Sequence, residues 1–170
     1  VLIAALLAGE YRKARLLNFL DPWQDQFGVG YQLIQSLASV GSGGVFGQGL
    51  GSSIQKLLFL PEAHNDFIYA IIAEETGLIG ASIVFLIIVF LFRKNIQAAF
   101  LHEDKFKRLL VFGLSFLIFV QSFVHVFVVL GLLPTKGLTL PFVSYGGSAI
   151  IVTMFFVGVI LRSIEEVVQE

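Results

Sequence analysis

The sequence predicts an all-α protein that crosses a membrane several times. Hydrophobic residues occupy 56% of the 170 positions and charged residues only 14%, and the mean hydropathy of +0.88 is outside the usual range of soluble domains. Three apolar segments, 67–92, 109–133 and 142–161, each reach the ~20 residues that a helix needs to cross ~30 Å of hydrocarbon. We expect helices because the bilayer core holds no water that would satisfy the backbone groups of irregular chain.

The part before the first span is expected to be mostly loop. Residues 1–9 are apolar but too few to cross a bilayer, so we interpret them as the end of a transmembrane helix. Residues 10–66 form a large loop with a glycine-rich run at 41–51. Apolar residues recur at helical spacing between positions 30 and 40, which favours a short interfacial helix within this loop.

Basic residues orient the predicted spans. The segment 93–108 between the first two spans carries a dense cluster of them: Arg93, Lys94, Lys105, Lys107 and Arg108. Such clusters in short loops stay in the cytoplasm, and Arg162 in the tail 162–170 agrees with this orientation. The large loop 10–66 and the turn 134–141 are then expected on the outer face. Basic residues in the large loop do not change this, because long loops translocate largely regardless of charge.

Acidic residues gather where the first span begins, in the segment 60–75. Asp66 is expected where water meets lipid, and Glu74 and Glu75 would lie ~12 to 13 Å deeper along a straight helix that rises about 1.5 Å per residue. Ionisable groups at such depth are functional candidates. The alternative is that Asp66, like Glu62 one helical turn earlier, only places negative charge at a helix start, where the dipole favours it.

Small and polar residues inside the spans are expected to serve helix packing. Gly77 and Ala81, four positions apart, form a small face on which a neighbouring helix can approach closely. Gln121 and His125, one turn apart, are expected to make an interhelical hydrogen bond rather than a proton relay.

Several chemistries find no support in the sequence. The chain has no cysteine, which removes disulfides, thiolate metal sites and cysteine nucleophiles. His64, His102 and His125 are scattered over a loop, the opposite side of the membrane and a span, so we assign no metal ligands. A net charge of -1 argues against a broad nucleic-acid surface. The glycine-rich run matches neither the Walker nor the dinucleotide fingerprint, and it is either an anion nest or only a turn.

The turn before the last span offers a second functional candidate. Lys136 lies between Pro134 and Pro141, and hydroxyls and paired glycines follow at 144–148. A fixed lysine beside a helix N-terminus suits a pyrophosphate. The alternative is an interfacial lysine that only extends to the headgroups.

Motifs along nearly the whole chain resemble those of one known family. In order, they are Tyr11-Arg-Lys-Ala-Arg15, Phe19-Leu-Asp-Pro-Trp23, Gly30-Tyr-Gln32, Gly47-Gln-Gly-Leu-Gly51, Leu60-Pro-Glu-Ala-His64 followed by Asp66, Pro134-Thr-Lys-Gly137, and Ser144-Tyr-Gly-Gly-Ser148. The chain thereby resembles the SEDS glycosyltransferases, which polymerise peptidoglycan from lipid II. Its Pro-Thr-Lys-Gly motif is similar to the division-type or sporulation-type branch rather than the elongation-type branch. Asn65 departs from the pattern, because the family usually has threonine there.

The resemblance implies a ten-helix membrane fold. This chain would hold its C-terminal part, with the end of one helix, the large outer loop and three complete transmembrane helices. The implied enzyme is an inverting lipid II polymerase of cell division in the bacterial cytoplasmic membrane, with its site on the outer face. A fragment alone is expected to be inactive. Implied partners are lipid II, a cognate class B penicillin-binding protein transpeptidase, other division proteins and membrane lipids.

The resemblance also implies roles for single residues. The family's essential aspartate falls on Asp66, which we expect to act as general base toward the attacking sugar hydroxyl. Substrate contacts are expected from Lys56, Glu62, His64, Lys136, Ser144 and Tyr145. Candidates to stabilise the leaving pyrophosphate are Arg12, Arg15, Lys56 and Lys136. No cofactor is assigned, and a requirement for a divalent cation stays open.

Two other classes of function stay open. A lipid II flippase would depend on a carboxylate near the membrane midplane, Glu74 or Glu75, whereas polymerisation at the membrane surface depends on Asp66. A scaffold for division proteins would keep its function without Asp66.

Overall fold

The structure is a computed structural model that describes residues 19–25, 28, 30–53 and 65–169. The expected helix end at 1–9 lies outside the described residues. So do five of the predicted site residues: Arg12, Arg15, Lys56, Glu62 and His64.

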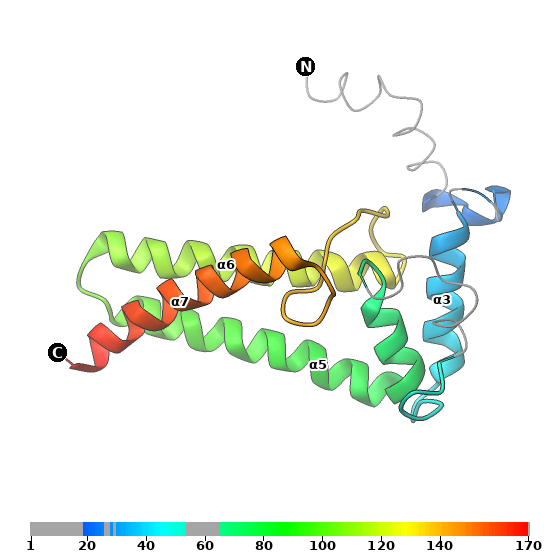
Figure 1. The fold of residues 1–170 in the computed structure, drawn as a ribbon, viewed down its shortest axis with the longest axis horizontal. Coiled ribbons are helices and arrows are strands. Elements are labelled where there is room, and N and C mark those ends of the chain that lie inside the picture. The colour runs from blue at the N-terminus through cyan, green and yellow to red at the C-terminus, as the bar shows by residue number, and fades with distance from the viewer. Residues whose placement is uncertain (1–18, 26–27, 29, 54–64, 170) are drawn as a thin grey trace, which may run out of the picture.

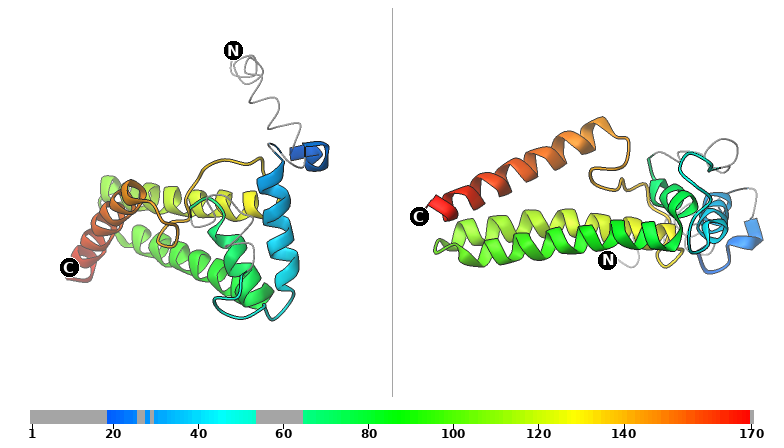
Figure 2. Two further views of the ribbon diagram at one scale, coloured as in Figure 1. Left: turned by 45° about the vertical axis from the view of Figure 1, so that its right-hand side comes forward. Right: turned by 90° about the horizontal axis from the view of Figure 1, so that it is seen from below.

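The described residues form helices joined by turns, which confirms the predicted all-α class. The elements are η1 (Pro22–Asp25), α3 (Tyr31–Gly43), α5 (Ile68–Leu101), α6 (Lys105–Val129) and α7 (Gly147–Gln169). Three of them, α5, α6 and α7, contain segments long and apolar enough to cross a membrane. These three run roughly along one direction, and α3 lies across one end of them (Figures 1 and 2).

Helix α5 is broken at Gly77, where the predicted span was straight. Gly77 has φ 69° and ψ -169°, a conformation that only glycine adopts readily. We call residues 68–76 the short arm and residues 78–101 the long arm. The short arm runs beside α3 and across the direction of the long arm, which pairs with α6 (Figure 1). Gly77 therefore bends the chain, whereas Ala81 in the long arm is buried as expected.

The glycine-rich run satisfies the backbone groups that this break exposes. The N–H groups of Leu78 and Ile79 donate to the carbonyls of Gly44 and Val45, at 2.9 and 3.3 Å. In return, the N–H groups of Gln48 and Gly49 donate to the carbonyls of Glu74 and Glu75, both at 3.0 Å. A side chain at Gly47 would collide with the Glu75 carbonyl, so the loop needs glycine for this approach. Paired backbone groups make such a break tolerable at membrane depth.

The break changes where the acidic residues lie. A straight helix would place Glu74 and Glu75 ~12 to 13 Å deeper than Asp66 along the span. That expectation is wrong, because the short arm, which begins just after Asp66 and carries Glu74 and Glu75, runs across the long arm rather than along it (Figure 1).

The helices also begin and end at other residues than predicted. Helix α5 continues to Leu101 and α6 starts at Lys105, so most of the predicted loop 93–108 is helical. Asp104 caps α6 by accepting from the N–H of Phe106 at 2.8 Å. At the other end of α6, irregular chain extends to Gly146, and α7 begins at Gly147 rather than at position 142.

The main core lies where α3, the short arm and α6 meet. Its buried residues are Phe67, Tyr69, Ala70, Ile71, Ala73, Ala81, Val126, Val129 and Leu140. Several are small, which lets the helices approach closely. The Tyr69 hydroxyl donates to the Ala81 carbonyl at 2.9 Å and ties the two arms together across the bend, and Ser36 of α3 donates to the Val129 carbonyl at 2.9 Å. The core thus fixes the short arm, which begins next to Asp66.

Candidate active site

Asp66 lies at the start of the short arm, one residue before the N-cap. The helix begins at Ile68, with Phe67 at the N-cap position and no side-chain capping bond from it. Phe67 is buried in the core while Asp66 is half-buried. The core contact of Phe67 therefore anchors the backbone on which the carboxylate sits.

Gly137 lies directly against the Asp66 carboxylate. A Cβ atom added to Gly137 would lie 3.1 Å from Asp66 Oδ2, 3.7 Å from Cγ and 3.8 Å from Oδ1. The N–H of Leu138 donates to the carbonyl of Lys136 at 2.9 Å, so the chain folds into a tight γ-turn centred on Gly137. Two segments some seventy positions apart in the sequence thus meet at the predicted general base.

Lys136 and Tyr145 are the exposed members of this region. Lys136 directly precedes Gly137, its side chain is exposed, and it makes no ion pair with any described carboxylate. Tyr145 is 77% exposed. The Lys136 side chain therefore starts one residue from Gly137, and its ammonium group is available to an anionic ligand.

The Ser144 side chain is buried and bonds to backbone groups of the protein. Its hydroxyl donates to the Asn65 carbonyl at 2.6 Å and accepts from the N–H of Leu140 at 2.7 Å, and the residue is 4% exposed. The Ser144 N–H also donates to the Leu140 carbonyl at 3.0 Å. We expected Ser144 to contact substrate. Its burial and its backbone partners indicate instead that it supports the turn.

Two side chains of α6, Gln121 and His125, also bind the turn. Gln121 Nε2 donates to the Thr139 carbonyl at 2.9 Å and lies 3.3 Å from the Thr139 hydroxyl. His125 Nδ1 lies 2.6 Å from the Leu138 carbonyl, which only accepts, so Nδ1 carries the hydrogen. The expected interhelical hydrogen bond is wrong as to partner, because both side chains bind backbone carbonyls of the turn.

Phe142, directly after the turn 134–141, has a strained backbone conformation. Its φ is 68°, a left-handed conformation that a bulky residue rarely adopts and that costs roughly 1–3 kcal/mol. It lies inside the loop that Leu140 and Ser144 close with their mutual hydrogen bonds. Strained residues of this kind persist where the surrounding contacts over-determine them.

Glu74 forms a separate acidic site at the far end of the short arm. It is 1% exposed, and its Oε2 accepts from the Ser53 hydroxyl at 2.6 Å. Its neighbour Glu75 is half-buried. Both glutamates lie beside the glycine-rich run and the break at Gly77, so their surroundings differ from those of Asp66, which lies near Gly137.

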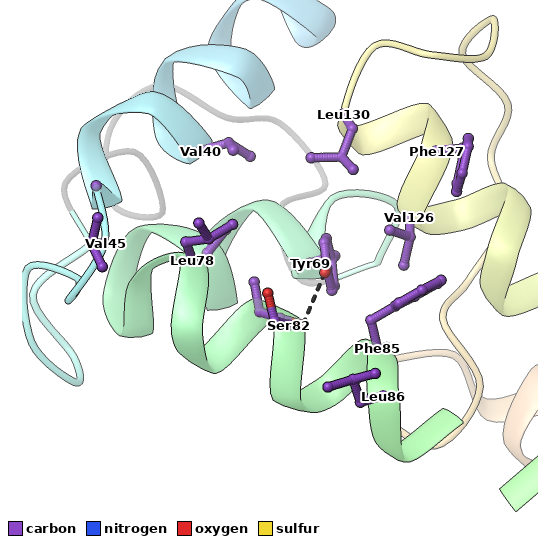
Figure 3. A pocket seen from close by; sticks show the side chains of 13 residues that line it. Val40, Val45, Tyr69, Leu78, Ser82, Phe85, Leu86, Val126, Phe127 and Leu130 are labelled. Atoms are coloured by element: carbon purple, nitrogen blue, oxygen red, sulfur yellow. Dashed lines mark hydrogen bonds between the residues drawn. The ribbon is translucent and has the colours of Figure 1, made fainter. Parts of the chain in front are cut away.

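An apolar cavity of about 600 Å³ lies between α3, the two arms of α5 and α6. Its walls include Val40, Tyr69, Leu78, Phe85 and Leu130, and the Tyr69 hydrogen bond to the long arm runs along it (Figure 3). None of the described residues that line it carries a carboxylate or an amine, so we assign it no reaction chemistry.

Within the part of the chain that the structure describes, no three His, Cys, Asp or Glu side chains form a group that could hold a metal ion. The site as described consists of a carboxylate, a glycine close to it, an exposed lysine and polar side chains that bind the turn.

Sequence reasoning named Asp66 and Lys136 as candidates but not the residues that hold the turn with Lys136 near Asp66. Gly137 belonged to one of the family motifs but had no role assigned to it, and Gln121 was expected to bond to another helix rather than to the turn. A glycine inside a lysine-bearing, proline-flanked turn is a signal for a close approach, but only the structure shows what approaches it.

These features define a multi-pass membrane protein with a carboxylate-containing site at one end of its helices. The family model of the FtsW, RodA and SpoVE proteins, described as "Cell cycle protein", matches residues 1–168. The chain belongs to this family, as its motifs predicted.

Its relatives include proteins named "Probable peptidoglycan glycosyltransferase FtsW". That of Thiomicrospira cyclica is 49% identical over 165 residues, which cover 95% of this chain and 42% of the relative. That of Geobacter metallireducens is 49% identical over 153 residues, covering 90% of this chain and 41% of the relative. The chain therefore spans about two fifths of the length of these relatives.

A solved structure has a similar fold. It is described as "Structural coordination of polymerization and crosslinking by a peptidoglycan synthase complex", and it matches with a TM-score of 0.76 and 26% sequence identity. The match covers 98% of this chain and 46% of that chain. The fold is thus that of the C-terminal part of a SEDS protein.

Proposed function

We propose that the protein to which this chain belongs is a glycosyltransferase that polymerises lipid II into peptidoglycan strands during cell division. The names of its relatives and its family membership support this activity. The observation that carries the proposal is the contact of the Asp66 carboxylate with the turn that bears Lys136. The transfer requires a base for the attacking hydroxyl and a cation for the leaving group, and the turn beside Asp66 carries a lysine.

The reaction is a single displacement at the anomeric carbon of the donor sugar. A sugar hydroxyl of the acceptor attacks this carbon, and Asp66 takes the hydroxyl proton as the new glycosidic bond forms. The bond to the pyrophosphate breaks, and the polyprenyl pyrophosphate leaves with its electron pair. Lys136 stabilises the negative charge that develops on it. One displacement inverts an α-linked donor to a β-linked product without a covalent enzyme intermediate.

Other residues complete the proposed site. Tyr145 is exposed and available for substrate contact. Glu62 and His64 are proposed substrate contacts, Arg12 and Arg15 proposed phosphate ligands, and Lys56 is proposed for both roles. These five lie outside the described residues.

The proposed site faces the outer side of the cytoplasmic membrane. Single cysteines at Ser42 and Thr135 should react with an impermeant thiol reagent in intact cells, and one at Glu103 should not, because the basic cluster near Glu103 is expected inside. The reverse pattern would refute the outward site.

The similar solved structure supports the proposal of a transpeptidase partner. The similar solved structure is described as a synthase complex that couples polymerization and crosslinking. We propose a class B penicillin-binding protein as the partner of this protein, together with other division proteins and the surrounding lipids.

Purified protein tests the activity directly. The full-length protein with its partner is given lipid II in detergent, where transport across a membrane has no meaning, and glycan strands are measured by gel. We expect strands with the wild type and none with Asp66→Asn. Absence of strands with the active complex would overturn the proposal.

A transport function is the second candidate, and the break in α5 is the observation that favours it. Broken helices and buried carboxylates occur in secondary transporters, and Glu74 is buried next to the break. If Glu74→Gln or Glu75→Gln abolishes function in cells while Asp66→Asn does not, transport becomes the better explanation. If none of the three matters, a scaffold role remains.

A further inference from the structure

We propose that Gln121, His125 and Ser144 are positioning residues for Asp66, which act by holding the turn 134–141 close to its carboxylate. The inference rests on the proposed function, because it assigns to these residues a part in the transfer reaction. None of them is proposed to touch the substrate. They act through Gly137 and through the backbone next to Asp66.

The turn depends on side chains for its position. Residues 134–140 have no helix or strand assignment, and the backbone bonds that they make among the described residues are the γ-turn around Gly137 and those of the Leu140 carbonyl with the N–H groups of Val143 and Ser144. Three consecutive residues are instead bound by side chains from elsewhere. His125 binds the Leu138 carbonyl, Gln121 binds the Thr139 carbonyl, and Ser144 binds the Leu140 N–H.

These bonds affect the surroundings and the position of Asp66 in two ways. Through Gly137, the held turn lies close to the carboxylate and leaves no room for a side chain between them, because a Cβ atom added to Gly137 would lie only 3.1 Å from Oδ2. Through Ser144, the turn is tied to the carbonyl of Asn65, the residue that precedes Asp66. A shift of the turn therefore moves both the wall against the carboxylate and the backbone that carries it.

Burial makes these bonds hard to replace. Ser144 is 4% exposed and His125 is 1% exposed, so water does not readily substitute for a lost partner. Removing one side chain leaves a buried backbone group unsatisfied, and the turn is expected to move to satisfy it. A misplacement of about 1 Å can cost about a hundredfold in rate.

The kinetic test is Ser144→Ala in the full-length protein with its transpeptidase partner. We expect kcat for glycan synthesis to fall about ten- to a hundredfold while KM for lipid II stays within about twofold, because only the catalytic geometry is disturbed. Ser122→Ala is the matched control. Ser122 is 2% exposed on α6, and its hydroxyl bonds only within its own helix, to the Ile118 carbonyl at 2.9 Å. It should leave kcat unchanged.

A second measurement follows the geometry without any activity. The chain has no cysteine, so Asp66→Cys with Gly137→Cys introduces a single pair into it, in a full-length protein freed of any other cysteines. The new sulfur at position 66 would lie near the place of Asp66 Cγ, 3.7 Å from a Cβ at position 137, which is close enough for a disulfide after a small adjustment. We expect this cysteine pair to form a disulfide rapidly. Adding Ser144→Ala should slow disulfide formation several-fold, whereas adding Ser122→Ala should leave its rate unchanged.

The two measurements separate the possible failures. If the wild type makes no glycan but crosslinking depends on Ser144, the proposed function fails while the geometric part of this inference stands. If Ser144→Ala keeps normal kcat, or crosslinks at the original rate, the positioning role is overturned. Should Ser144→Ala not accumulate in the membrane, Gln121→Ala replaces it with the same expected results, because Gln121 holds the neighbouring carbonyl.

Discussion

The two ends of the long helices are held by different kinds of side-chain interaction. At the end with residues 102–108 and 162–166, charged side chains pair with one another: Lys107 with Glu166 at 2.7 Å and Arg162 with Glu165 at 3.1 Å. At the end with Asp66 and the turn 134–141, the bonds that hold the chain run from the side chains of Gln121, His125 and Ser144 to backbone groups.

This difference has a physical reason. Exposed ion pairs such as Lys107–Glu166 contribute little to stability, and their charged groups are occupied by each other rather than available to a ligand. At the site end, side chains that bind backbone groups hold the chain, and Lys136 makes no ion pair with a described carboxylate. We therefore expect substitutions at the site end to affect catalysis strongly and equivalent substitutions at the ion-paired end to affect it weakly.

Asp66→Asn should have the largest effect. The amide keeps the shape and most hydrogen bonding of the carboxylate but cannot take the proton of the attacking hydroxyl. Loss of a general base lowers the rate by ~10² to 10⁴, whereas loss of a charge at a helix start costs only ~0.3 to 1 kcal/mol of stability. Glycan synthesis from lipid II, with membrane level and partner binding as checks, distinguishes these outcomes.

Asp104→Asn is the matched control for Asp66→Asn at the opposite end. Asp104 caps α6, and asparagine is an equally good N-cap residue, so activity should be normal. Near-normal synthesis by folded Asp66→Asn protein would contradict the base assignment and remove the contrast between the ends.

Lys136→Ala should lower polymerisation about ten- to a hundredfold, because a lost charge-assisted contact to the leaving group is worth roughly 1.5 to 3 kcal/mol. Lys136→Arg keeps the charge and should recover part of the rate. Initial rates with lipid II measure both variants. An unchanged rate for Lys136→Ala would make this lysine an interfacial anchor only.

Gly137→Ala should lower the rate by about tenfold, because its Cβ would meet Asp66 Oδ2 at 3.1 Å and the carboxylate would have to move by a few tenths of an ångström. Gly113→Ala on α6 adds the same methyl group where no atom lies within 4 Å. It should be neutral in the same rate assay. Equal rates for the two variants would show that the contact with Gly137 does not constrain Asp66.

Lys107→Ala should have the smallest effect. Its ion pair with Glu166 joins side chains that are 40% and 34% exposed, and such pairs contribute about 0 to 1 kcal/mol. We expect polymerisation within about twofold of the wild type and a small change in melting temperature. A tenfold loss of activity would instead mean that the two ends are energetically coupled.

The two arms of α5 show how far local pattern predicts structure. Both arms are apolar, and the sequence predicted one straight span. The short arm buries Tyr69, Ala70 and Ala73 in protein, whereas Leu78, Leu86 and Phe90 of the long arm are largely exposed, as expected for contact with lipid. Apolar composition identifies a helix without distinguishing these surroundings, because lipid tails and a protein core have similar polarity.

Several properties of this protein follow from its sequence alone. The membrane class follows from composition, the long apolar helices from the length of the apolar segments, and the family from motifs in a fixed order. Asp66 and Lys136 were also identified as candidates, because an acid at a span boundary and a lysine in a rigid turn are chemically unusual. All of these are properties of single residues or of contiguous segments.

Only the tertiary structure decided how these parts meet. The bend at Gly77 depends on the glycine-rich run that satisfies its backbone groups, and the partners of Gln121 and His125 depend on the path of the turn. The contact of Gly137 with Asp66 joins segments some seventy positions apart. Hydrophobic periodicity and helix propensity act within a few turns of chain, whereas such contacts are set by how separate helices and turns pack, so no local pattern encodes them.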